Sequence, residues 1–199
     1  MNFHYFSEDP KGRLKYYKYS IEVRGVKLTI ISCSGVFSAR RLDKGTEVLI
    51  KYMIVRDGWF ICDLGCGVGV IGLVAASLSP HGFVVMTDIN RRAVRLAKLN
   101  ALKNGIKNVE VRWGDLYEPL KGLRFDTIIS NPPQSAGLTT CYELIRGAPA
   151  HLRKGGLLQL VARHNKGGRR LLSEMERVFG SAEVVGGEGG YKVYIAKRP

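Results

Sequence analysis

Apolar residues follow two different periods along this chain, and each period predicts a different kind of structure. Between residues 15 and 33 they alternate with polar residues on either side of an Arg24-Gly25 pair. Alternation with a period of two, interrupted by a short turn, is typical of a half-buried β-hairpin. Further along, short apolar runs alternate with segments whose apolar residues recur every three or four positions. That second pattern predicts strands and helices in alternation.

The alternating order of strands and helices predicts a parallel sheet with right-handed crossovers. The expected strands are residues 60–64, 83–87, 108–113, 125–130 and 157–161. Asp43 or Thr46 can cap the helix before the first of these strands. Asn90 can cap a later helix, whose apolar face is expected to include Leu99 and Leu102.

The length of 199 residues predicts one domain. We expect residues 1–45 to form the hairpin and the segment leading into the first helix, as an appendage of the main domain at residues 46–199. Residues 152–156 are expected to be the turn before a strand. Residues 182–185 and 191–195 flank a glycine-rich loop, which predicts a terminal hairpin.

Composition limits the environment and the chemistry. No segment near the start is apolar enough for a secretory signal or a transmembrane helix, so we expect a soluble, cytoplasmic protein. The four cysteines show no Cys-x-x-Cys spacing and the four histidines are equally dispersed. These patterns do not favour a metal site, and reduced thiols are typical of a cytosol.

The chain is strongly basic, with 31 Lys and Arg against 17 Asp and Glu and a formal net charge of +14. Such a charge attracts polyanions, and nucleic acid is the commonest polyanion in a cytosol. An acidic protein partner and a merely solvated basic surface are the alternatives. The N-terminal hairpin mixes tyrosines with lysines, so it could contact nucleic acid, or its tyrosines could cover the protein beneath.

A glycine-rich turn follows the first strand of the alternating region. It reads Asp63-x-Gly65-x-Gly67-x-Gly69 and continues into a helix, so backbone N–H groups and a helix N-terminus converge there. An acid inside this turn would repel a pyrophosphate and attract an ammonium group, as in the zwitterionic end of S-adenosylmethionine. The next strand ends in Asp88, where a doubly wound sheet places an acid on ribose hydroxyls. A glycine turn without a ligand is the alternative.

The tripeptide Asn131-Pro132-Pro133 follows the fourth strand, at the edge where open α/β sheets bind ligands. Two prolines fix φ and donate no hydrogen bonds, so the Asn131 amide and the Pro132 carbonyl are expected to face outward as acceptors. Two such acceptors can orient an amino group. By itself the tripeptide could also be a rigid turn.

The order of these motifs resembles class I S-adenosylmethionine-dependent methyltransferases. A Gly35-Val36-Phe37-Ser38 turn, a short basic spacer and the pattern Asp43-x-Gly45-Thr46 before a helix are similar to the methyltransferase small domain family. That group includes bacterial ribosomal RNA guanine-N2 methyltransferases, and the resemblance spans nearly the whole chain. It implies a Rossmann-like α/β fold: a seven-stranded, mostly parallel sheet with helices on both faces and its last strand antiparallel.

The motifs and the resemblance together suggest the site residues, with S-adenosylmethionine as cofactor and no metal. The cofactor-binding candidates are Asp63, Gly65, Gly67, Gly69, Asp88, Ile89, Gly114, Asp115 and Asn131. The catalytic candidates are Asn131, Pro132 and Pro133. The substrate-binding candidates are Phe37, Ser38, Arg40, Gln134 and Arg169.

The resemblance implies N-methylation of an exocyclic amino group in RNA, first of all guanine-N2 of ribosomal RNA, with transfer RNA as a second substrate. Methylation of protein glutamine or of a small amine, and a non-catalytic protein that binds cofactor and RNA, stay open. Many relatives have an aromatic residue after Asn-Pro-Pro to stack on a flipped base, where this chain has Gln134. We expect Phe37 or an aromatic residue of the hairpin to take that role.

Overall fold

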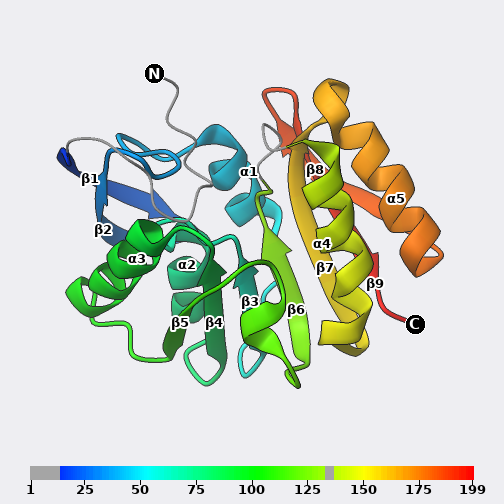
Figure 1. Cartoon of the computed structure of the whole chain (residues 1–199), viewed down its shortest axis with the longest axis horizontal. Helices are drawn as coiled ribbons and strands as arrows, with labels where there is room; N and C mark the ends of the chain where they lie inside the picture. Colours follow the sequence, from blue (N-terminus) through cyan, green and yellow to red (C-terminus); the bar gives the residue numbers. More distant parts are fainter. Residues whose placement is uncertain (1–13, 133–136) are drawn as a thin grey trace.

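The computed structural model describes residues 14–132 and 137–199 (Figure 1). Its first element is the predicted hairpin, made of β1 (Tyr16–Val23) and β2 (Val26–Cys33). The turn residues Arg24 and Gly25 both have positive φ, of 49° and 77°. Two consecutive residues with positive φ match the twist of a two-residue hairpin turn, which explains the glycine.

The main sheet has seven strands in the order β5-β4-β3-β6-β7-β9-β8. The strands are β3 (Phe60–Leu64), β4 (Phe83–Asp88), β5 (Val109–Trp113), β6 (Phe125–Ser130), β7 (Leu152–Arg163), β8 (Glu183–Glu188) and β9 (Tyr191–Lys197). The five neighbouring strands β5, β4, β3, β6 and β7 pair in parallel, and β9 pairs antiparallel with both β7 and β8. The predicted sheet, with an antiparallel last strand, is therefore confirmed.

Helices cover both faces of this sheet (Figure 1). The helices α1 (Lys44–Tyr52), α2 (Val70–Leu78) and α3 (Arg91–Lys103) share one core with the hairpin, and α4 (Leu138–His151) and α5 (Arg169–Phe179) share the other. Successive side chains of a strand point to opposite faces. On β3, Ile61 accordingly belongs to the first core and Cys62 to the second.

Two short elements complete the chain: a 3₁₀ turn, η1 (Glu118–Leu120), and a π-type turn, η3 (His164–Gly168). The four cysteines are buried and unpaired. In the described ranges no helix combines the length and apolar character needed to cross a membrane. Within the same ranges no cluster of three or more His, Cys, Asp and Glu is arranged to hold a metal ion.

Two asparagines, Asn100 of α3 and Asn104 at the C-cap of that helix, attach the hairpin to the main domain. The buried Asn100 accepts from the Ile31 N–H through Oδ1 (2.8 Å) and donates to the Ile31 carbonyl through Nδ2 (2.9 Å). One helical turn later, Asn104 does the same with Thr29, at 2.9 Å each. The two side-chain amides thus satisfy the backbone groups of β2 as a further strand would.

The predicted apolar face of α3 was partly wrong, and the attachment of the hairpin explains why. Leu99 and Leu102, expected to be buried, are 42% and 79% exposed. The buried face instead contains Asn100, flanked by Ala97 and Ala101. One face of a helix packs on the rest of the protein. Because Asn100 bonds to β2, that face is the one that contains Asn100, although periodicity alone assigns this polar residue to the surface.

The structure also corrects two strand boundaries. Residues 152–156 are not a turn before β7 but belong to it, as a bulge where the register with β6 shifts. The amide of Gly155 bonds to the Arg198 carbonyl, so the chain terminus pairs with this bulge. Gly186 and Gly187, expected in a loop, lie within β8, and the hairpin turn is Gly189-Gly190 alone.

Replacing Asn100 by alanine is expected to loosen the hairpin. The variant leaves the part-buried N–H and C=O of Ile31, and the buried Val68 carbonyl, without their side-chain partner, which should lower the free energy of unfolding by about 1–3 kcal/mol. Urea unfolding measures the loss, and hydrogen exchange should speed up at Ile31. Leu102→Ala, on the exposed side of the same helix, is the control; an equal loss in both variants would contradict the anchoring role.

Candidate active site

A cavity of about 480 Å³ lies at the edge of the sheet where β3, β4 and β6 end. Many of the predicted site residues line it: Phe37, Gly65, Gly67, Asp88, Ile89, Gly114, Asp115, Asn131 and Pro132. They come from loops far apart in the sequence, and the parallel strands bring these loops to one edge. This volume is in the range of cavities that hold a small-molecule ligand.

The glycine-rich turn forms the floor of the cavity. The N–H groups of Gly65 and Cys66 both donate to the Thr87 carbonyl at 2.8 Å, which ties the turn to the end of β4. Gly65 and Gly67 have φ of 74° and 56°, and a Cβ atom on either would meet no atom within 4 Å. The two glycines therefore keep open the space that a ligand lying against the backbone would need.

Asp88, the last residue of β4, lines the cavity beside this turn. Its Oδ2 accepts from the Gly67 N–H (2.7 Å) and its Oδ1 from the Asn90 N–H (2.8 Å). Burial raises the pKa of Asp88 above its ordinary value, and the two backbone bonds oppose the shift. The carboxylate is thus held in one orientation, which suits a group that must accept from paired hydroxyls.

Two of the cofactor candidates do not line the cavity. Gly69 is the N-cap of α2, and a Cβ there would lie 3.2 Å from that of Ala97. Asp63 is fully buried beneath the turn, where its Oδ2 accepts from the Gly72 N–H at 2.8 Å. Its Oδ1 has no partner among the described residues, and burial raises its pKa to about 7. A contact of Asp63 with an ammonium group stays a prediction.

Asn131 is anchored to the start of α1. Its Nδ2 donates to Asp43 Oδ2 (3.1 Å) and to Thr46 Oγ1 (3.0 Å). Because a carboxylate only accepts hydrogen bonds, the amide nitrogen must be the atom facing Asp43. Both Nδ2 hydrogens are then in use, and Oδ1 points away from them as an acceptor. Asp43 rather than Thr46 is the N-cap of α1, since the same Oδ2 accepts from the Thr46 N–H (3.0 Å).

The remaining substrate candidates lie in different places. Ser38 lines a small side pocket next to Phe37, and its hydroxyl donates to the Arg41 carbonyl. Arg40 packs over the Tyr17 ring of the hairpin, 5.3 Å from the centroid, and does not line the main cavity. Arg169 donates to the His164 ring at 3.2 Å, also outside the cavity. Pro133 and Gln134 lie outside the described residues.

The cavity also has a wall that the sequence reasoning missed, formed by Arg163 and Tyr191. Arg163 is the last residue of β7, and it escaped notice because that strand was expected to end at residue 161. Tyr191 is the first residue of β9, which runs antiparallel, so its beginning lies beside the end of β7. Thr140 and Glu143 of α4 close another side.

The fold and the site define a class I S-adenosylmethionine-dependent methyltransferase. The chain belongs to the methyltransferase small domain family, which it matches over residues 27–195. S-adenosylmethionine is therefore its cofactor. The structure fits that molecule, since the two open glycines admit it close to the backbone and Asp88 is fixed at the tip of the next strand.

Two proteins are similar to this chain over most of its length. It is 34% identical to the Bacillus subtilis protein YbxB, described as uncharacterized, over the full length of both chains. It is 36% identical to ribosomal RNA small subunit methyltransferase C of Pseudomonas syringae, over 91% of this chain and 54% of that protein. The chain thus spans about half the length of that relative.

A solved structure agrees in fold. The Thermus thermophilus 16S rRNA N2 G1207 methyltransferase, in complex with AdoMet and guanosine, superposes with a TM-score of 0.81 at 26% identity. The match covers 92% of this chain and 51% of that one.

The buried Asp63 is expected to make stability depend on pH. Its folded-state pKa of about 7 lies above the ordinary value of 3.8, so the folded protein holds a proton that the unfolded chain releases. This contribution is fully present below the unfolded pKa and is lost as the pH rises to about 7. Asp63→Asn should reduce that loss of unfolding free energy by roughly 1–4 kcal/mol.

Urea unfolding of the cofactor-free protein at several pH values between about 4 and 8 measures the effect. Asp88 has a raised pKa as well and contributes with the same sign, so the variant retains part of the slope. An unchanged slope in Asp63→Asn would show that Asp63 does not carry the proton.

Proposed function

We propose that this protein transfers the methyl group of S-adenosylmethionine to an exocyclic amino group of RNA, namely N2 of guanine. The observation that carries the proposal is the orientation of Asn131, whose Nδ2 is held by Asp43 and Thr46 so that Oδ1 is left as an acceptor at the cavity. Similarity to proteins named as ribosomal RNA methyltransferases supports RNA as the substrate class.

The arrangement addresses the weakness of the nucleophile. The nitrogen lone pair of an exocyclic amine is delocalised into the base, so the amine is planar and unreactive. Asn131 Oδ1 and the Pro132 carbonyl can each accept one of its hydrogens and fix the nitrogen in line with the methyl group. S-adenosylmethionine supplies that group as an electrophile on a sulfonium. When the new N–C bond forms, the bond from carbon to the sulfonium would break and the demethylated cofactor would leave. The methylated nitrogen is then acidic and would release its extra proton to solvent, so no strong base is required. The protein therefore works by positioning and by electrostatic stabilisation.

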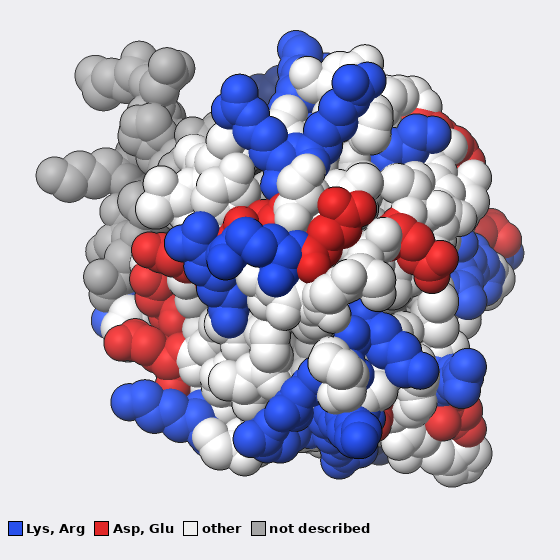
Figure 2. Space-filling model, turned by 90° about the vertical axis from the view of Figure 1, so that its right-hand side faces the viewer, with Lys and Arg blue, Asp and Glu red and all other residues white. Residues whose placement is uncertain are grey.

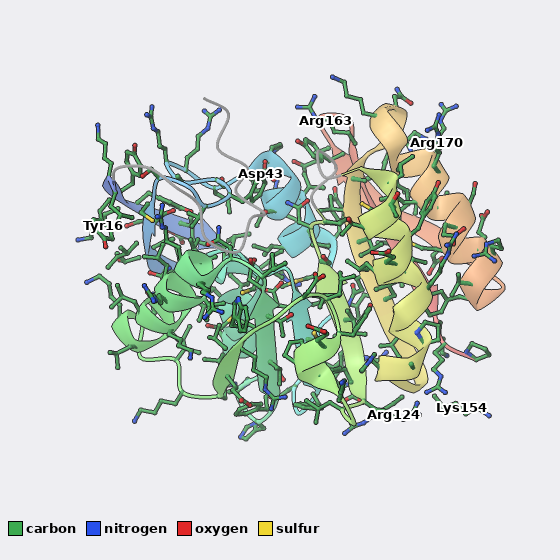
Figure 3. The ribbon with its side chains drawn as sticks, in the orientation of Figure 1. Tyr16, Asp43, Arg124, Lys154, Arg163 and Arg170 are labelled. Atoms are coloured by element: carbon green, nitrogen blue, oxygen red, sulfur yellow. The ribbon has the colours of Figure 1, made fainter. Side chains whose placement is uncertain are left out.

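Charge supports a polyanionic substrate. The net charge of +14 is large for 199 residues. On the face carrying α5 and β8, Lys and Arg side chains project from the upper end and also gather at the lower end, and acidic side chains are mixed with basic ones between them (Figure 2). The upper end is also where Arg163 and Arg170 lie, at the edge of the sheet that carries the cavity (Figure 3).

Other substrates that could accept the methyl group fit this structure less well. A protein glutamine or a small amine also presents an amino group that Asn131 could orient. A strongly basic surface gives no advantage with a small amine, and with a protein substrate only if that protein is acidic. A protein that binds the cofactor without catalysis has no use for an amide held by two bonds at the cavity. Ribosomal RNA is the first substrate to test, and transfer RNA is the second.

Asn131→Ala is expected to lose methyl transfer by about 100-fold or more while binding cofactor normally, because the residue acts on the acceptor amine. Incubation of the full chain with labelled S-adenosylmethionine and total RNA, followed by nucleoside analysis, measures transfer. Calorimetry with the demethylated cofactor measures binding. Thr46→Val removes one of the two anchors and should cause a smaller loss.

Two outcomes would reject the proposal. Wild-type protein that binds cofactor but labels no RNA would favour a binding module or another acceptor. A fall in cofactor affinity as large as the fall in rate would place Asn131 in cofactor binding instead.

Arg170→Gln is expected to weaken RNA binding and to lower the slope of log affinity against log salt by about one, because a phosphate contact is lost. Lys154→Gln is the control with the same change of charge at the opposite end of the molecule (Figure 3). Titration of labelled RNA at several salt concentrations tests both. Equal slopes for the two variants would mean that the cavity edge is not the RNA-binding surface.

A further inference from the structure

The wall of Arg163 and Tyr191 stands on the acceptor side of the cavity. The glycine turn, Asp88 and Asp115 follow β3, β4 and β5, whereas Asn131 follows β6. In the order of the sheet, β7 and β9 continue beyond β6, away from the cofactor strands. Arg163 and Tyr191 belong to these two strands, so Asn131 lies between them and the cofactor site. Figure 3 shows Arg163 at the same end of the molecule as Asp43.

Several contacts hold this pair in place. Arg163 and Tyr191 are paired across β7 and β9. The Arg163 Nε donates to the Tyr191 hydroxyl (3.1 Å), and the guanidinium carbon lies 5.1 Å from the centre of the Tyr191 ring. The ring packs on the first turn of α1, where a Cβ on Gly45 would come within 2.9 Å of Tyr191 Cε1. Gly45 is thus the residue that makes room for the tyrosine.

The guanidinium has donors to spare. Among the described residues its Nε makes the one hydrogen bond to protein, and Nη1 and Nη2 make none there. Asp43, which anchors Asn131, attracts the same cation and helps to raise the Arg163 pKa, after the larger effect of the Tyr191 hydroxyl. Arg163 therefore presents a fork of N–H groups at the cavity and stays charged at all relevant pH values.

We propose that Arg163 recognises the acceptor base as guanine by donating to its O6 and N7, and that Tyr191 positions Arg163 for this contact. The inference rests on the proposed function, because it concerns the base whose N2 faces Asn131. Guanine carries N2 on one edge and the acceptors O6 and N7 toward the other, and arginine is the usual partner of that pair. Adenine has an amino donor in place of O6, so it would set donor against donor.

The experiment compares guanosine with 7-deazaguanosine, which lacks the N7 acceptor and is otherwise alike. Binding of each nucleoside to the full chain, saturated with demethylated cofactor, is measured by calorimetry or by ligand-observed NMR. Wild-type protein should bind guanosine about tenfold more tightly, as expected for one hydrogen bond to a charged donor. In Arg163→Met the two affinities should agree within about twofold, through weaker binding of guanosine.

Matched variants separate the roles. Tyr191→Phe keeps the ring and removes only the hydroxyl, so it should give a preference between those of wild type and Arg163→Met; a preference equal to that of wild type would overturn the positioning role. Lys154→Met removes a positive charge at the opposite end and should keep the tenfold preference. Unchanged affinity for the demethylated cofactor shows that each variant is folded.

The inference is overturned if wild type binds both nucleosides equally or if Arg163→Met keeps the full preference. Either result would leave the proposed function standing wherever RNA is methylated on guanine. Conversely, a protein that shows the Arg163-dependent preference but labels no RNA would retain the guanine site and lose the proposed reaction.

Discussion

One carboxylate oxygen, Oδ2 of Asp43, organises the side of the cavity that carries Asn131. It caps α1 by accepting from the Thr46 N–H, and it accepts from Nδ2 of Asn131 at the tip of β6. A helix N-terminus and a negative charge stabilise each other, so this oxygen is held firmly before any ligand arrives. Because Thr46 supplies the second acceptor, Asn131 has one favourable orientation. The direction of its Oδ1 follows from the capping of a helix that lies far away in the sequence.

The side of the cavity at the glycine-rich turn has a different pair of carboxylates. Asp88 is bound by two backbone N–H groups and reaches the cavity, whereas Asp63 has one such bond and is shut beneath the glycine turn. Burial raises the pKa of both, and the charge of Asp88 also contributes to raising that of Asp63. A cationic ligand above the turn would favour the ionised forms, so the cofactor and these two acids should stabilise one another.

Much of this architecture could be predicted from the sequence, because periodicity reports burial. The alternation in residues 15–33 and the strand and helix order required only local patterns. The inward face of α3 could not be predicted, since it depends on Asn100 meeting the backbone of Ile31, 69 positions away. The start of β7 at Leu152 could not be predicted either. A bulge interrupts the strand pattern there, and the backbone groups of the bulge bond to Arg198, which is distant in the sequence.

The residues of the candidate site also fall into those that the sequence could indicate and those that it could not. Asp88 and Asn131 could be found because each follows an apolar strand of a parallel sheet, and the ends of such strands meet at one edge. Tyr191 could not, because it begins its strand. The antiparallel insertion of β9 between β7 and β8 reverses the rule, so the first residue of the last strand lies beside the last residue of β7. A search for site residues in this topology must therefore cover the ends of the parallel strands and the beginning of the antiparallel one. In this chain that addition supplies an aromatic ring to the lining of the cavity that also contains Asn131.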